Sequence, residues 1–233
     1  MKKRFIVCVV FLAVFVVGIL STGNFMIGTW LDWYADIYDR PVAGLLFFPW
    51  YLYLVVKEIE MTYTANVIVR IKRKTELLRM LFYKCFAVAF WFAVSTNGLC
   101  TIIPFVFARE CPSSKEAGIW FISLLVSHTL LWFVLGGLYV IILLKTDRII
   151  VSSIVVLLVF NILLFGRQSH LYSLRNVFPD VFEYMLMGKN DDVKKTVIQL
   201  SCVMLVELFV ALAAKRIINR KGFYQGYDNT GES

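Results

Sequence analysis

Charged residues are scarce in this sequence of 233 residues: they make up 17% of it, against 60% hydrophobic and 16% aromatic residues. A soluble domain needs a charged and polar surface around its core, and so few charges make a soluble fold of this length a poor fit. The composition instead predicts an integral membrane protein. The expected fold class is all-α, a polytopic bundle of transmembrane helices.

The motifs of several enzyme classes are also missing. The sequence has no glycine-rich phosphate loop ending in Lys-Ser or Lys-Thr, no His-Glu-x-x-His and no Gly-x-Ser-x-Gly. Its two histidines, His128 and His170, are too few for a three-histidine metal site, and its five cysteines form no Cys-x-x-Cys. We therefore expect a protein that is not an enzyme and that holds no cofactor. Whether Cys100 and Cys111 form a disulfide stays open.

Six apolar runs reach or approach the length of about 20 residues that a transmembrane helix needs. They cover residues 5–22, 41–61, 80–108, 118–144, 149–166 and 197–218. Together they predict one six-helix domain over residues 1–221, followed by a disordered tail over residues 222–233. The first run also fits a signal peptide, but an uncleaved span is favoured because its removal would spoil the charge balance of the remaining loops.

The positive charges are distributed unevenly between the predicted loops. If both termini are cytoplasmic, the inner segments carry 16 of the 24 Lys and Arg residues. This asymmetry follows the positive-inside rule, so the surplus charge reports orientation and not nucleic-acid binding. We expect a multi-pass protein of the cell membrane with both termini in the cytoplasm.

Two of the predicted connections have distinctive lengths. Residues 145–148 are too few for anything except a tight inner turn between two antiparallel spans. Residues 167–196 form the longest outer connection. Within it, the half-apolar stretch over residues 171–188 contains Pro179 and several charges, and it is too short and too charged to cross. It predicts a re-entrant or interfacial element on the outer side, between the fifth and sixth spans.

The most basic stretch lies between the second and third spans, at residues 61–84. At helical spacing, its apolar and its charged residues fall on opposite sides. The apolar stripe holds Val67, Ile71, Leu78 and Leu81, and the charged side holds Lys72, Arg73, Glu76 and Arg79. This pattern is typical of a helix at a membrane surface. Such a helix either binds anionic lipid or serves as a docking element for a soluble partner.

Four polar residues interrupt the predicted spans: Asn97, His128, Asn161 and Glu207. Glu207 lies near the middle of the last span, where a carboxylate costs at least about 2.5 kcal/mol unless it is protonated or paired. It is therefore a candidate functional residue, with a hydrogen bond to a neighbouring helix as the structural alternative. For the lone His128, a packing hydrogen bond is favoured over a proton relay.

Taken together, these features resemble the permease subunit of a type-2 ATP-binding-cassette (ABC) transporter, in its small bacterial form. The stretch over residues 60–84, with Arg70, Lys72, Arg73 and Lys74 ahead of two leucines, is similar to the coupling segment of that family. The step Val177, Phe178, Pro179 resembles the family's outer step before the last span, although a small residue is expected where Phe178 stands. The resemblance covers most of the chain and rests on layout more than on motifs.

The resemblance implies an exporter subunit that moves a hydrophobic or amphipathic substrate, such as a peptide, drug or lipid. A separate ABC ATPase would hydrolyse ATP and push on a cytoplasmic coupling helix. It also implies that the chain works as a homodimer or beside a similar permease. The implied ATPase-coupling residues are Tyr63, Val67, Arg70, Ile71, Lys72, Arg73, Lys74 and Arg79. Two alternatives stay open: a non-transporting assembly, immunity or sensor subunit, and an intramembrane enzyme centred on Glu207.

Overall fold

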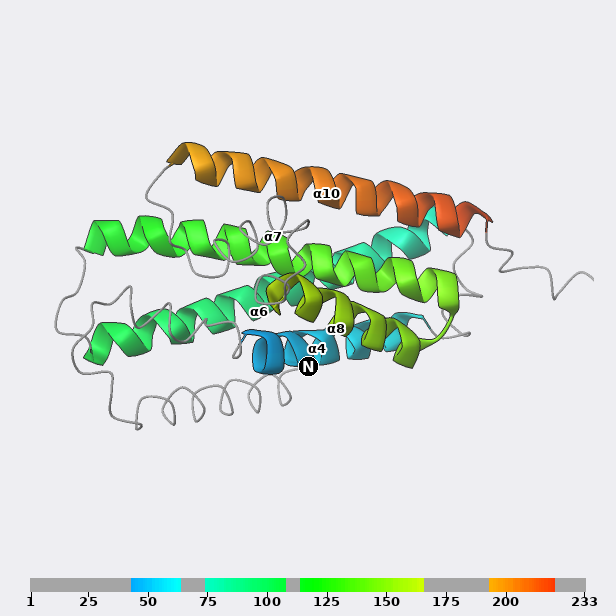
Figure 1. Ribbon diagram of the computed structural model, residues 1–233, viewed down its shortest axis with the longest axis horizontal. Helices are drawn as coiled ribbons and strands as arrows, with labels where there is room; N and C mark the ends of the chain where they lie inside the picture. Colours follow the sequence, from blue (N-terminus) through cyan, green and yellow to red (C-terminus); the bar gives the residue numbers. More distant parts are fainter. Residues whose placement is uncertain (1–42, 64–73, 108–113, 166–192, 221–233) are drawn as a thin grey trace, which may run out of the picture.

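The computed structural model describes residues 43–63, 74–107, 114–165 and 193–220, and these residues are almost entirely helical. They form the π-helical turn η1 (Ala43–Phe47) and the helices α4 (Phe48–Thr62), α6 (Lys74–Phe107), α7 (Ser114–Thr146), α8 (Ile149–Phe165) and α10 (Val193–Arg220) (Figure 1). The all-α prediction is confirmed for this part of the chain.

Five of the six predicted apolar helices fall within the described residues, and all five form. Their ends differ from the prediction by a few residues, most at α6, which begins at Lys74 and not at Met80. The predicted first span, the greater part of the outer element over residues 167–196, Cys111 and the tail lie outside the described residues.

Two helices in the described residues are long and apolar enough to cross a bilayer. They are the stretches Lys74–Thr101 of α6 and Trp120–Thr146 of α7, and α8 is apolar but shorter. Less of the α6 stretch is buried in the bundle than of the α7 stretch, 33% against 61%. α7 is therefore the inner helix of the two, while much of α6 faces outward.

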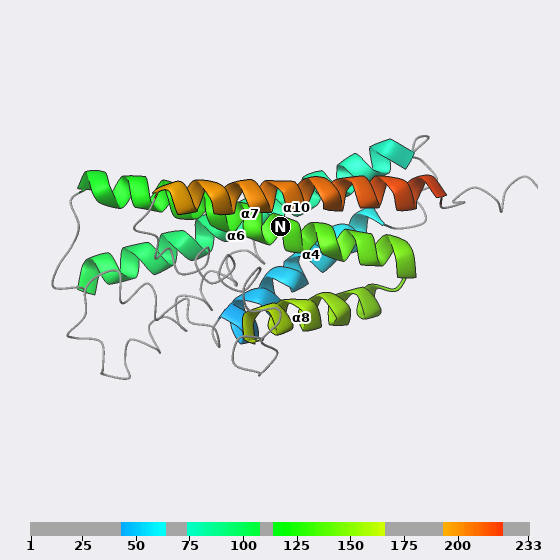
Figure 2. The same cartoon turned by 45° about the horizontal axis from the view of Figure 1, so that its top comes forward.

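α7 lies at the centre of the bundle and contacts α4, α6, α8 and α10. Two views show α6 and α8 running antiparallel to α7, while α10 lies beside α7 and runs in the same direction (Figures 1 and 2). As a result, α4, α7 and α10 end, and α6 and α8 begin, at the same end of the bundle. We call this the charged end, after the side chains described below.

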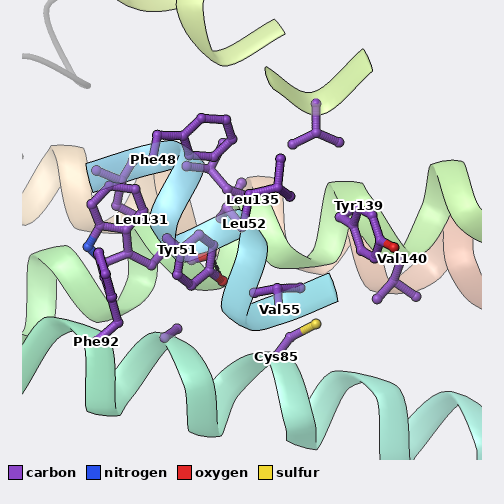
Figure 3. Packing of buried hydrophobic residues seen from close by; sticks show 14 of the residues in the cluster. Phe48, Tyr51, Leu52, Val55, Cys85, Phe92, Leu131, Leu135, Tyr139 and Val140 are labelled. Atoms are coloured by element: carbon purple, nitrogen blue, oxygen red, sulfur yellow. Dashed lines mark hydrogen bonds between the residues drawn. The ribbon is translucent and has the colours of Figure 1, made fainter. Parts of the chain in front are cut away.

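The core is organised around stacked aromatic rings from four helices. The ring of Trp132 on α7 lies 5.1 Å from that of Tyr51 on α4 and 5.2 Å from that of Phe92 on α6, measured between centroids. Phe48 stacks on Phe160 of α8 at 4.0 Å. All five rings are buried, and Figure 3 shows Tyr51 between α6 and α7. Offset and edge-on arrangements are the ones that aromatic pairs favour, so these contacts stabilise the core.

The glycine pair of α7 permits the closest helix approaches in this core. A Cβ atom at Gly136 would lie 2.7 Å from the Tyr51 hydroxyl and 3.2 Å from the Cβ of Cys85, and one at Gly137 would lie 2.7 Å from Cγ1 of Val210. Any side chain at these two positions would push α4, α6 or α10 away. The small residues therefore determine how near α7 its neighbours lie.

The predicted tight turn after α7 is present. α7 ends at Thr146, and α8 begins at Ile149 after only two connecting residues. Asp147 adopts a left-handed backbone conformation with φ of 55°, and its N–H donates to the carbonyl of Leu143 at 2.8 Å. This is the geometry by which a single left-handed residue ends a helix. The turn brings the Asp147 side chain to the charged end.

Candidate functional site

Charged side chains gather where α4, α7 and α10 end and α6 and α8 begin. The basic residues of the described chain near this end are Lys57, Lys74, Arg79, Lys84, Lys145, Arg148, Lys215, Arg216 and Arg220. The acidic ones are Glu58, Glu60, Glu76 and Asp147. At the opposite end, the described residues carry Lys115, Glu116, Lys194 and Lys195. The charge asymmetry predicted along the sequence is thus also an asymmetry between the two ends of the bundle.

Tyr63 ties the end of α4 to the turn between α7 and α8. Its hydroxyl donates a hydrogen bond to Oδ1 of Asp147 at 2.8 Å, across 84 residues of sequence. Partial burial and this hydrogen bond to a carboxylate raise the pKa of Tyr63 above its ordinary value. The hydroxyl therefore stays protonated at neutral pH and remains a donor to Asp147.

Lys74 makes the corresponding contact at the start of α6. Its ammonium Nζ donates to the backbone carbonyl of Asn219 at 3.3 Å, in the last turn of α10. A helix leaves its last carbonyls without intrahelical partners, and a cation at that end also complements the helix dipole. Tyr63 and Lys74 thus attach both ends of the segment over residues 64–73 to the bundle, one to the α7–α8 turn and the other to α10.

A second set of contacts joins α4 to α6 at the charged end. Nζ of Lys84 lies 3.0 Å from Oε2 of Glu58, whose side chain is only 13% exposed. Lys57 pairs with Glu60 at 3.0 Å on the surface of α4. Because exposed pairs contribute little, the half-shielded pair of Lys84 and Glu58 is the one that adds to the rigidity of this end.

Of the predicted ATPase-coupling residues, Tyr63, Lys74 and Arg79 are described. Arg79 is exposed on α6, as predicted for the charged side of the segment. The other five, Val67, Arg70, Ile71, Lys72 and Arg73, lie outside the described residues, so a coupling helix there stays a prediction. Residues 74–84 are the first turns of the long helix α6 and do not form a separate helix. They are ordered this way because Leu77 and Leu81 pack into the bundle core.

The predicted intramembrane polar residues occupy three different places. Asn97 of α6 and His128 of α7 are fully buried. They lie at one level of the bundle, each about one turn beyond the contact of Phe92 with Trp132. Asn161 donates its Nδ2 to the carbonyl of Leu157 at 2.9 Å, on its own helix. That bond satisfies one of the two N–H donors of its amide nitrogen.

Glu207 is half-buried on the face of α10 that carries Val203, Val210 and Ala214. Because Val210 meets Gly137 and the two helices run in parallel, Glu207 is level with residue 134 of α7. His128 is six residues away along α7, which is about 9 Å along the axis. Oε1 of Glu207 is buried and has no hydrogen-bond partner among the described residues. Neither the predicted hydrogen bond nor a pairing with His128 is present for this oxygen.

Two contacts of the charged end were missed in the sequence. They are the hydrogen bond of Tyr63 to Asp147 and the ion pair of Glu58 with Lys84. The sequence offered two indications of these contacts. One is the charge of Asp147 in the two-residue connection after α7, and the other is the opposite charges of Glu58 and Lys84 near the ends of consecutive spans. Neither indication identifies a partner, because the contacts join residues that are 84 and 26 positions apart.

The site therefore consists of a charged bundle end with two attachment points for a basic segment, together with the Glu207 carboxylate in the middle of α10, whose Oε1 has no hydrogen-bond partner among the described residues. Comparison with protein-family models, with curated proteins and with solved structures gave no match.

Proposed function

We propose that this chain is the membrane-spanning permease subunit of an ABC exporter, with six spans, both termini cytoplasmic and a coupling helix within residues 64–73. The observation that carries the proposal is the attachment of both ends of this basic segment to different helices, through Tyr63 to Asp147 and through Lys74 to Asn219. A soluble ATPase that pressed on the segment would act on the α7–α8 turn and on α10 at once.

The outer surface of the bundle supports a membrane setting. Large apolar side chains are exposed along α6, α8 and α10, among them Tyr83, Trp91, Ile150, Ile154, Leu158, Ile162, Met204, Leu205, Leu208, Phe209 and Leu212. Apolar surface on this scale is rare on soluble monomers and is ordinary where lipid is the solvent. Apart from Tyr83 and Ile150, these exposed apolar residues lie farther along the helices than the charged end, which suits a headgroup position for the charges.

The proposed mechanism is a rigid-body transmission. Closure of the ATPase on its nucleotide displaces residues 64–73, and the two attachment points pass that displacement to the α7–α8 hairpin and to α10. Packed helices shift between discrete arrangements more readily than they deform, so a small movement at the charged end is converted into a change of packing in the bundle. The chain itself contributes no hydrolytic residue to this cycle.

Co-purification tests the proposal. The full chain is extracted from its native host in mild detergent, and an associated ATPase is identified by mass spectrometry and by ATP hydrolysis. Reversal of charge at Arg70, Lys72, Arg73 and Lys74 to Glu is expected to release the ATPase. The matched control is the double reversal of Lys194 and Lys195, which lie at the opposite end of α10 and should leave the ATPase bound.

Retention of the ATPase by the fourfold variant contradicts coupling at this segment. Absence of any ATPase from the wild-type preparation contradicts the exporter itself. That second result favours the non-transporting alternative, in which the same basic segment binds anionic lipid alone.

A further inference from the structure

Glu207 has no internal cation to neutralise it in the described part of the bundle. Lys84 lies at a comparable level on α6, but its ammonium pairs with Glu58 on α4. Residues two apart on a helix point to opposite sides, so Lys84 faces away from the side of α6 that holds Phe82 and Phe86. The other basic residues near α10 in the described chain lie two turns or more along the helix, from Lys215 onward.

Aromatic rings of α6 and α7 lie near the level of Glu207. The ring of Phe82 reaches to within 3.4 Å of a Cβ position at Gly137, the same point that Val210 of α10 contacts. Phe133 precedes Gly137 by one turn on α7, and Glu207 precedes Val210 by about one turn on α10. Because Gly137 and Val210 meet, Phe133 and Glu207 lie at the same level of the bundle. The ring of Phe133 meets those of Phe82 and Phe86 edge-on, at centroid distances of 6.0 and 5.6 Å.

Within the described residues, this place is partly exposed at the surface of the bundle. α6 begins beside the end of α10, where Lys74 contacts Asn219, and the two helices diverge toward the other end (Figures 1 and 2). Phe86 is 44% exposed, and Glu207 is half-buried. In the described part of the chain, a molecule in the surrounding apolar phase can therefore reach the ring of Phe86, which contacts Phe133 at the level of Glu207.

We propose that Glu207, with the rings of Phe82, Phe86 and Phe133, forms a binding site for a lipophilic organic cation. The carboxylate supplies the counter-charge, and the ring faces attract the cation through their quadrupoles. A delocalised or quaternary cation fits this chemistry best, because it loses little hydration on entering an apolar site. The inference deepens the proposed function by naming a substrate class, and it rests on that function only for the transport step.

Direct binding to the purified full chain tests the site. Tritiated tetraphenylphosphonium is the probe, measured by equilibrium dialysis in mild detergent without ATPase or nucleotide. The wild-type chain is expected to bind it saturably, and Glu207→Gln, which keeps the shape of the side chain but removes its charge, to bind it about tenfold more weakly or worse. Glu76→Gln, a change of the same kind on the exposed start of α6, is the matched control and should bind like the wild type.

Two further measurements separate charge recognition from adhesion to an apolar surface. Tetraphenylborate has nearly the same shape and the opposite charge, and it should fail to displace the phosphonium from the wild-type chain. Phe86→Leu keeps an apolar side chain but removes a ring, and it should weaken phosphonium binding while leaving the elution profile unchanged. This variant and the borate comparison decide the question even if Glu207→Gln does not fold.

Any one of three results would overturn the site. They are equal phosphonium binding by the wild type and Glu207→Gln, effective competition by tetraphenylborate, and no saturable binding to the wild type. These results are independent of the ATPase experiment, which reports on the charged end. If the phosphonium test overturns the cation site but the fourfold variant still releases the ATPase, the exporter proposal stands and the substrate is of another class.

Discussion

Tyr51 and Gly136 show how single residues determine the packing of the bundle core. Tyr51 donates its hydroxyl hydrogen to the carbonyl of Trp132, which lies one helical turn before Gly136 on α7. The hydroxyl occupies the space that a side chain at Gly136 would need. A buried hydroxyl requires a partner, and this contact gives it one inside an aromatic cluster.

Gly136→Ala is expected to destabilise the protein by about 1–3 kcal/mol, the usual cost of overpacking a filled core. The added Cβ would lie 2.7 Å from the Tyr51 hydroxyl and 3.3 Å from Sγ of Cys85. Gly98→Ala is the control, because nothing lies within 4 Å of a Cβ at that position in α6. There the better helix propensity of Ala should be neutral or stabilising by up to about 1 kcal/mol. Thermal unfolding of both variants in detergent gives the comparison, and equal midpoints would refute the close contact.

Tyr51→Phe removes the hydrogen bond to Trp132 and should cost about 0.5–1.5 kcal/mol. In the Gly136→Ala background, the same change also removes the clashing oxygen, so the double variant should be less destabilised than the sum of the two single variants. The double-mutant cycle is measured by the same unfolding assay. Strict additivity would mean that the hydroxyl and the glycine do not share this space.

At the scale of elements, α10 is attached along one narrow stripe. Its buried residues are Val203, Val210, Ala214 and Ile218, and most of the rest of its described surface is exposed. The stripe packs chiefly on α7, where Gly137 admits Val210. A helix held along one stripe can be displaced as a unit with few other contacts to break.

Gly137→Ala should therefore loosen α10 selectively, because its Cβ would lie 2.7 Å from Cγ1 of Val210. Hydrogen exchange followed by mass spectrometry is expected to show faster exchange in peptides from α10 than in peptides from α4 or α8. Val210→Ala removes the opposing methyl groups and should restore slower exchange when combined with Gly137→Ala. Uniformly faster exchange in all helices would indicate global destabilisation instead.

The link between α4 and the α7–α8 turn makes a prediction about coupling. Tyr63→Phe removes the hydrogen bond to Asp147 without changing the charge of the basic segment. If the exporter proposal holds, the ATPase should remain bound while substrate-stimulated hydrolysis falls by about twofold to tenfold, the factor equivalent to one hydrogen bond. Tyr53→Phe is the control, since Tyr53 is exposed on the side of α4. Equal hydrolysis by the two variants would exclude Tyr63 from the transmission.

At the scale of the whole molecule, the charge asymmetry predicts orientation. Arg148→Cys should react with a membrane-impermeant maleimide only after the cells are permeabilised, because the charged end is expected in the cytoplasm. Lys115→Cys, at the start of α7, should react in intact cells. Labelling is measured above the background of the parent chain. Reaction of Arg148→Cys in intact cells would reverse the orientation and remove the basis for a cytoplasmic coupling segment.

The positions of the helices could be predicted closely because apolar runs and their flanking charges are local features of the sequence. The start of α6 was placed too late because Thr75, Glu76 and Arg79 are polar. Helix nevertheless continues through them, since Leu77 and Leu81 have a core to pack against. The basic segment and Glu207 were also identified from local composition, as unusual charges next to or within apolar surroundings.

What the sequence by itself determined is therefore the five helices of the described residues and the uneven distribution of charge along them. Only the tertiary structure decided that α7 is central, that Tyr51 reaches Trp132, that Tyr63 reaches Asp147, and that Oε1 of Glu207 is buried without a hydrogen-bond partner among the described residues. Each of these facts depends on side chains from different helices, and composition and periodicity describe one helix at a time. The physical reason is that close packing selects among many arrangements of the same apolar helices, and the contacts that select are non-local.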